Sequence, residues 1–238
     1  MSSNPGPLPV IAFLGGGNMA RSLIGGLVVR GADPARIRVA EPVQALREAL
    51  AADFGVQAFP DAASAVEGAG LWLLAVKPQV MRGVCEPLAP VAARSRPLVV
   101  SIAAGIPVDR LREWLGDGTA VVRCMPNTPA LLGAGVTGLY AGPGVEAGQR
   151  AQAEAVLAAA GATVWIDEEP LMDAVTAVSG SGPAYVFLLA EAMQAAARAE
   201  GLGPEQARTL VVHTLLGAAR MLSETGEPAD ELRRRVTS

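Results

Sequence analysis

The stretch Val10-Ile-Ala-Phe-Leu14-Gly15-Gly16-Gly17-Asn18-Met19-Ala20 decides the fold of this chain. Its apolar run predicts a buried strand, and the glycines predict a tight turn into a helix over residues 19–30. The turn is a Gly-x-Gly-x-x-Ala form of the dinucleotide-binding motif, in the strand-to-helix context that the motif requires. Gly15 permits the turn, Gly17 lets a pyrophosphate approach the backbone, and Ala20 permits close helix–strand contact.

The same alternation of short apolar runs and helices continues to about residue 167. Further strands are expected at 37–40, 56–59, 71–76, 98–103, 120–124, 136–140 and 163–166, with helices at 43–53, 62–67 and 79–88. Such alternation predicts an α/β fold with a parallel, doubly wound sheet of the Rossmann type. We therefore expect a dinucleotide-binding domain over residues 1–167.

Beyond residue 167 the sequence favours helices alone. They are expected at 168–177, 184–200 and 204–225, with another beginning near Pro228 and an interruption at Ser179-Gly-Ser-Gly-Pro183. Two of these helices are apolar all round, and such helices must be buried. Residues 168–238 are thus expected to form an all-helical domain that dimerises. Packing of these helices on the first domain is the alternative.

Composition excludes several classes of protein. A chain of 238 residues with 51% hydrophobic content and a net charge of −4 is globular rather than disordered. No apolar run is long enough for a membrane span, and residues 1–9 lack the basic residue of a secretory signal. Two cysteines, Cys85 and Cys124, favour a reducing cytoplasm. The single histidine, His213, excludes a multi-histidine metal site and is expected in a core or an interface. No basic cluster points to nucleic acid.

Several predicted strand ends carry small or polar residues, and ligands of open α/β sheets bind beyond these ends. Glu41 follows the second strand, where an acidic residue bonds a ribose hydroxyl and disfavours a 2′-phosphate. Arg38 and Arg47 are near enough in sequence to serve a 2′-phosphate instead. Lys77, the only lysine of the chain, ends the fourth strand. One shared cleft is expected, also bordered by the segments 101–105 and 125–129.

The chain resembles the pyrroline-5-carboxylate reductases in several motifs. They are Gly-Gly-Gly-Asn-Met-Ala (15–20), Ala-Val-Lys-Pro-Gln (75–79), Ser-Ile-Ala-Ala-Gly (101–105), Arg-Cys-Met-Pro-Asn-Thr-Pro (123–129), the run from Asp173 to Tyr185, and Leu-Arg-Arg-Arg-Val-Thr-Ser (232–238). The resemblance implies reduction of 1-pyrroline-5-carboxylate to L-proline by NADPH or NADH. It also implies a helical dimerisation domain and assembly of five dimers in a ring.

The motifs and the resemblance together give a set of expected cofactor-binding residues. They are Gly15, Gly16, Gly17, Asn18, Met19, Ala20, Glu41, Ala75, Val76, Lys77, Pro78, Ala103 and Asn127. Asp61 stands where many family members carry an Asn against the cofactor, so that contact differs here.

The resemblance also bears on the substrate. In the family, Val-Thr-Ser runs into a glycine-rich turn that binds the substrate carboxylate, and Ser238 is the first residue of that turn. We therefore expect Ser238 at the edge of the substrate site. A protein that ended at Ser238 is expected to bind the dinucleotide but to reduce the imine poorly. No catalytic acid or base and no metal ligand is assigned.

Two other functions fit parts of the pattern. A related Rossmann imine or hydroxyacid reductase would share the layout, but hydroxyacid enzymes need a lysine beyond the Rossmann domain, and Lys77 is the only lysine. A non-catalytic sensor would bind the dinucleotide without turnover.

Overall fold

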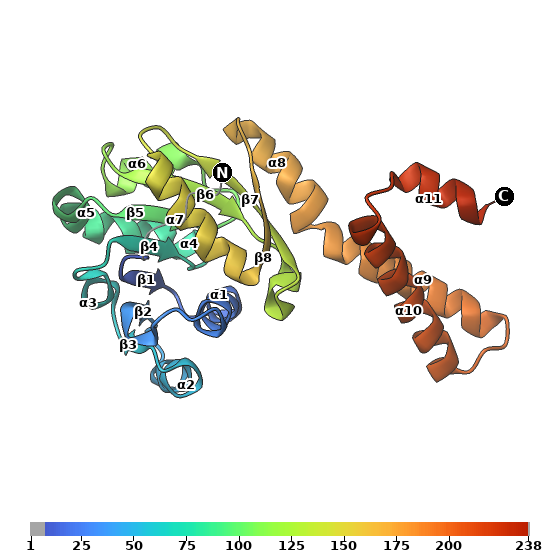
Figure 1. Ribbon diagram of the computed structural model, residues 1–238. Coiled ribbons are helices and arrows are strands. Elements are labelled where there is room, and N and C mark those ends of the chain that lie inside the picture. The colour runs from blue at the N-terminus through green and yellow to red at the C-terminus, as the bar shows by residue number, and fades with distance from the viewer. Residues whose placement is uncertain (1–7, 238) are drawn as a thin grey trace. The chain divides into compact units, whose positions relative to one another are not determined.

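The computed structural model describes residues 8–237, which divide into two compact units, the first ending at Ser181 and the second beginning at Gly182 (Figure 1). The first contains a single sheet with helices on both faces, and the second contains helices only.

The sheet of the first unit has eight strands in the order β3-β2-β1-β4-β5-β6-β7-β8. The strands are β1 (Ile11–Leu14), β2 (Ile37–Ala40), β3 (Gln57–Phe59), β4 (Leu71–Leu74), β5 (Leu98–Ser101), β6 (Ala120–Met125), β7 (Gly135–Ala141) and β8 (Gly161–Trp165). From β1 the next strands, β2 and β3, are added on one side, and from β4 the strands β5 to β8 are added on the other side. The order therefore reverses between β1 and β4, which is where open α/β sheets bind their ligands.

The helices of this unit connect successive strands. They are α1 (Asn18–Val29), α2 (Gln44–Phe54), α3 (Ala62–Val66), α4 (Pro78–Cys85), α5 (Ala89–Ser95), α6 (Val108–Leu115), α7 (Ala147–Leu157) and α8 (Met172–Val175). Short 3-10 turns are η1 (Pro34–Arg36), η2 (Glu86–Leu88), η3 (Thr128–Leu132), η4 (Ala158–Ala160) and η5 (Glu169–Leu171), and η6 (Thr176–Gly180) is a π-helix.

Alternation along the strands divides the core into two layers. In β1, Ile11 and Phe13 pack with α1, α2 and α7, whereas Ala12 and Leu14 pack with α3 to α6 on the opposite face. Successive strand residues point to opposite faces, so a strand buried on both faces is apolar throughout. The expected doubly wound Rossmann-type sheet is confirmed.

Two strands, β7 and β8, depart from the predicted parallel arrangement, because β8 pairs parallel to β7 and so shares its direction. β7 runs antiparallel to β6, with Cys124 opposite Leu139, while the other pairs are parallel. Only the short turn η3 joins the two strands, and a parallel crossover needs a dozen or more residues. The expectation of a parallel sheet was therefore wrong for β7 and β8.

The interruption predicted at Ser179–Pro183 is not a loop. The chain passes from α8 through the π-helix η6 and directly into α9 (Gly182–Ala199). Ser181 caps η6 with its backbone N–H bonded to the carbonyl of Thr176 at 2.8 Å. The predicted break is therefore confined to a single bend at Ser181.

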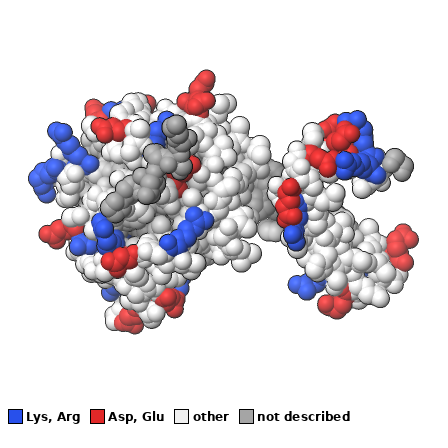
Figure 2. Space-filling model, viewed as in Figure 1, with Lys and Arg blue, Asp and Glu red and all other residues white. Residues whose placement is uncertain are grey.

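The second unit consists of α9, α10 (Pro204–Glu224) and α11 (Ala229–Val236). In this unit only Ala207 and Val211 are buried among the described residues, while α9 exposes most of its large apolar side chains. In Figure 2 the charged side chains of this unit gather at α11 and at helix ends, and uncharged surface lies between them. His213 is exposed on α10, so of the two expected places, a core or an interface, the core of this chain is excluded and the interface stays a prediction.

No helix within residues 8–237 is long and apolar enough to cross a membrane.

Candidate functional site

A cleft of about 530 Å³ opens at the carboxyl ends of β1, β2, β3 and β4. Its lining residues are Leu14, Gly15, Gly16, Gly17, Ala40, Glu41, Pro42, Pro60, Asp61, Ala62, Ala75, Val76, Lys77, Val80 and Val84. The cleft therefore lies at the reversal of strand order, and its walls come from four strand ends that are far apart in sequence.

The glycine turn between β1 and α1 forms the floor of the cleft. Gly15 has a φ of +106°, and a Cβ placed on it would lie 2.8 Å from the carbonyl oxygen of Ala75. The turn therefore requires glycine at this position for its conformation and for its closeness to the end of β4. A Cβ on Gly17, in contrast, would have no neighbour within 4 Å. The space beside Gly17 is open, as a site for a pyrophosphate requires.

The start of α1 provides hydrogen-bond donors toward that space. Gly17 is the N-cap residue and has no side chain with which to cap the helix. The first N–H groups of a helix lack partners within the helix, and the helix dipole favours an anion there. The glycine turn and the start of α1 thus fit a dinucleotide phosphate.

Glu41, a buried residue that is 8% exposed, closes one side of the cleft. Its Oε2 accepts a hydrogen bond from the backbone N–H of Gly16 at 3.2 Å, and its Oε1 accepts one from Val43 at 3.0 Å. A carboxylate offers about four acceptor positions, so acceptor capacity remains for ribose hydroxyls. Glu41 therefore both fixes the glycine turn and faces the cleft.

Neither arginine that the sequence offered for a 2′-phosphate lines the cleft. Arg47 donates through Nη1 to the backbone oxygens of Glu41 and Pro42, at 2.9 and 2.7 Å. Arg38 donates to the backbone oxygen of Glu67 and lies over the ring of Phe59, 5.7 Å from its centroid. Both guanidinium groups donate hydrogen bonds to backbone oxygens of the first unit.

Asp61 lies on the cleft wall at the end of β3 and caps α3. Its Oδ1 accepts the backbone N–H of Ser64 at 2.8 Å, and its Oδ2 accepts the Ser64 hydroxyl at 2.9 Å. These hydrogen bonds, the backbone one foremost, hold the pKa of Asp61 below its usual range. The family resemblance implies a cofactor contact at this position, and Asp61 indeed lines the cleft.

Lys77 stands on the other side of the cleft, at the N-cap of α4, and is exposed. Within residues 8–237 no carboxylate forms an ion pair with it. Its ammonium is therefore available to an anionic ligand.

Asn127 lies outside the cleft and bridges two segments. Its Oδ1 accepts the backbone N–H of Val136 at 3.0 Å, and its Nδ2 donates to the backbone oxygen of Ser179 in η6 at 3.1 Å. Nearby, a Cβ on Gly180 would lie 2.6 Å from the Met125 methyl carbon. Asn127 therefore fastens the end of β6 to the π-helix with an amide that is already engaged on both sides.

The expected cofactor residues divide into two groups. Gly15, Gly16, Gly17, Glu41, Ala75, Val76 and Lys77 come together in the cleft, whereas Asn18, Met19, Ala20, Pro78, Ala103 and Asn127 do not line it. Ala20 and Ala103 are buried in the two core layers. Ser238 lies outside the described residues. Cys85 and Cys124 are buried, and burial raises the pKa of the Cys85 thiol to about 12.

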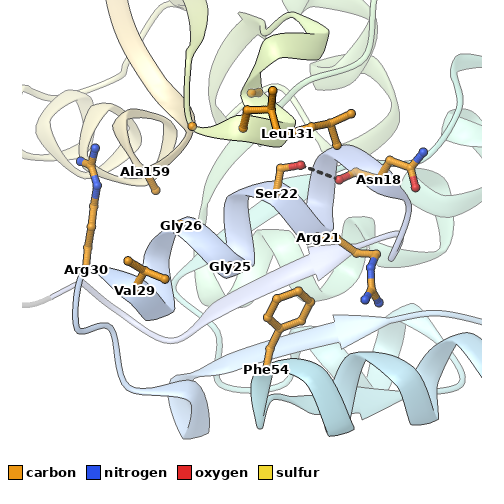
Figure 3. A pocket seen from close by; sticks show the side chains of 13 residues that line it. Asn18, Arg21, Ser22, Gly25, Gly26, Val29, Arg30, Phe54, Leu131 and Ala159 are labelled. Carbon is orange, nitrogen blue, oxygen red and sulfur yellow. Dashed lines mark hydrogen bonds between the residues drawn. The ribbon is translucent and has the colours of Figure 1, made fainter.

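A second cavity, of about 540 Å³, runs along α1 (Figure 3). Phe54 lies on one side of the helix, and Leu131 and Ala159 lie on the other. Arg21 forms an ion pair with Asp53 and stacks on Phe54, 5.1 Å from the ring centroid. Asn18 borders this cavity instead of the first. Because the glycine turn does not contribute to this cavity, it is a weaker site for a dinucleotide.

Two family models match the chain. Residues 169–238 match the family described as pyrroline-5-carboxylate reductase dimerisation, and residues 10–105 match the family described as NADP oxidoreductase, coenzyme F420-dependent.

Individual proteins are similar over nearly the whole chain. The pyrroline-5-carboxylate reductase of Pseudomonas aeruginosa is 53% identical, with 97% of this chain and 84% of that protein covered. That of Glycine max is 36% identical, with 98% and 85% covered. A solved pyrroline-5-carboxylate reductase from Coxiella burnetii superimposes with a TM-score of 0.94 at 40% identity, covering 97% of this chain and 86% of that one. The Plasmodium falciparum enzyme, solved with NADP bound, gives 0.84 at 25% identity, covering 97% and 84%. The chain belongs to the pyrroline-5-carboxylate reductase family.

Proposed function

We propose that this protein reduces 1-pyrroline-5-carboxylate to L-proline with NADPH or NADH, the last step of proline biosynthesis. The observation that carries the proposal is the cleft at the β1–β4 reversal, with its open space beside Gly17, in a chain of this family. The expected substrate is a small molecule, and neither nucleic acid nor a membrane is proposed as a partner.

Each expected cofactor residue, whether in the cleft wall or beside it, has a proposed role. Gly15, Gly16 and Gly17, with the first turn of α1 at Asn18, Met19 and Ala20, receive the pyrophosphate. Glu41 accepts hydrogen bonds from the ribose hydroxyls next to the adenine. Ala75, Val76, Lys77 and Pro78 border the path toward the nicotinamide, and Ala103 leaves room for its ring. For Asn127 we propose a positioning role, because both ends of its amide are engaged.

The bound nicotinamide supplies the hydride, and the chain supplies orientation. A protonated cyclic imine is already an electrophile at the carbon bonded to nitrogen, so the protein needs only to align the two rings and hold the carboxylate. We therefore assign no catalytic acid or base. Ser238 is proposed to lie at the edge of the substrate site.

For the assembly, we propose a homodimer formed by residues 168–238, and five dimers in a ring as the larger form. The exposed apolar side chains of α9 and α10 support a protein partner, because such surfaces are unfavourable in water. His213 on α10 is proposed to lie in that interface. Two buried free thiols are compatible with the cytoplasmic location that we propose.

The direct test is oxidation of NADH and NADPH by 1-pyrroline-5-carboxylate, followed by absorbance, with formation of L-proline confirmed by mass spectrometry. Reactions without the imine, and reactions with 2-keto acids in its place, are the controls. Turnover with the imine, and none with the 2-keto acids, supports the proposal. Dinucleotide binding without turnover would identify a sensor, and turnover with 2-keto acids alone would identify a hydroxyacid dehydrogenase.

A further inference from the structure

We propose that Asp61 acts with Glu41 to make the adenosine end of the cleft selective for NAD(H) over NADP(H). This inference rests on the proposed function, because it concerns the dinucleotide that the cleft receives. It assigns a specificity role to a side chain whose visible task is to cap α3.

The sheet brings the two carboxylates to neighbouring positions. Ala40 at the end of β2 pairs with Phe59 at the end of β3, and the backbone N–H of Glu41 donates to the oxygen of Phe59 at 2.9 Å. Glu41 and Asp61 therefore leave adjacent strands at the same edge, where neighbouring strands are ~4.8 Å apart. Both residues line the cleft.

No cation of the cleft wall lies at this end. The one basic lining residue, Lys77, follows β4, and β1 separates β4 from β2 in the sheet. Two strand spacings place the end of β4 ~10 Å from the end of β2. Arg38 does not line the cleft and donates to the backbone oxygen of Glu67. Arg47 does not line the cleft either, but it donates through Nη1 to the backbone oxygens of the lining residues Glu41 and Pro42, so its charge lies behind this part of the wall.

This arrangement treats the two dinucleotides differently. A 2′-phosphate carries a charge of about −1.5 to −2 at neutral pH, so it is repelled by both carboxylates. A 2′-hydroxyl is a donor that a carboxylate can accept. The oxygens of Asp61 are held in place by Ser64, so its charge stays at the cleft wall.

Asp61→Asn is a clean test, because Asn caps a helix about as well as Asp and only the charge is lost. Affinities for NADP+ and NAD+ are measured by calorimetry, without turnover, at low and high salt. We expect Asp61→Asn to tighten NADP+ binding about fivefold at low salt and to change NAD+ binding less than twofold. The difference should shrink at ~0.5 M salt, because an exposed charge is screened.

Ser64→Ala is the matched control, because it removes the hydroxyl partner of Asp61 but keeps its charge. Its ratio of NADP+ to NAD+ affinity should stay within about twofold of the wild type. Equal changes for both dinucleotides in Asp61→Asn, or none, would overturn the specificity role while leaving the proposed function intact. A wild-type protein that binds neither dinucleotide would overturn both.

Discussion

Two glycines of the same turn are expected to respond in opposite ways to a single added methyl group. In Gly15→Ala, the new Cβ lies 2.8 Å from the backbone oxygen of Ala75, and the φ of +106° is strained for any L side chain. Such strain costs about 1–3 kcal/mol, and the clash with the backbone adds to it. In Gly17→Ala, the Cβ meets nothing within 4 Å, and the φ of −69° suits any residue. Its cost in stability is at most about 1 kcal/mol, from the weaker N-cap.

Both variants should bind dinucleotides more weakly, but for different reasons. Gly17→Ala should fold like the wild type and yet bind NAD+ and NADP+ at least about tenfold more weakly, or 1.4 kcal/mol, because its methyl group fills the space beside the helix N-terminus. Gly15→Ala should lose binding together with stability.

Thermal unfolding at a fixed protein concentration measures the first effect, and calorimetric titration with each dinucleotide measures the second. Gly31→Ala, at a φ of +89° with open space around its Cβ and outside the cleft, controls for backbone strain alone. Wild-type affinity in a folded Gly17→Ala protein would refute the placement of the pyrophosphate beside Gly17.

Three further predictions concern the cofactor, the fold and the assembly. Glu41→Ser should raise the affinity for NADP+ relative to NAD+ by about tenfold, because a buried charge facing the ribose is lost; an unchanged ratio in titrations would mean that this carboxylate does not face the ribose. Glu169→Ala should destabilise the protein by about 3–5 kcal/mol in denaturant unfolding, because Glu169 forms a 3.1 Å ion pair with the buried Arg123 and also accepts the N–H of Val108 at 2.8 Å. Glu113→Ala, which breaks an exposed pair with Arg110, should cost less than about 1 kcal/mol, and equal effects would contradict this reasoning. In sedimentation at low micromolar concentration the protein should be a dimer or larger, and a compact, active monomer would contradict the proposed interface.

The elements near the glycine turn could be predicted because local signals define them. A buried parallel strand is apolar throughout, and the glycine pattern marks where the strand ends and the helix begins. The direction of β7 depends instead on the length of the connection through η3, which no hydrophobic pattern records. The helices α5, α6 and α7 were not predicted. The apolar periodicity of α7 is weak, whereas α6 carries Val108, Leu111 and Leu115 at helical spacing, a signal that was missed.

In the candidate site, too, residues with a local signal could be predicted and tertiary contacts could not. Glu41 and Lys77 could be predicted from their positions after strands. The hydrogen bond from Asn127 to the backbone oxygen of Ser179 joins residues far apart in the chain. The local sequence around Asn127 therefore could not predict it. Asp61 could be predicted as a helix cap from its place before an alanine-rich segment. Its place on the cleft wall depends on the pairing of β2 with β3, which is a tertiary contact.

Lys77 is a unique site for chemical labelling, because the other Lys or Arg positions of the chain are all arginine. The sequence has 19 basic residues, and Lys77 is the only lysine among them. Its side chain is exposed at the edge of the cleft. Apart from the chain's terminal amine, an amine-selective reagent such as an activated ester can therefore react at one place only. The extent of its acylation, read by peptide mapping, would report how often the cleft is filled, without any substitution in the protein.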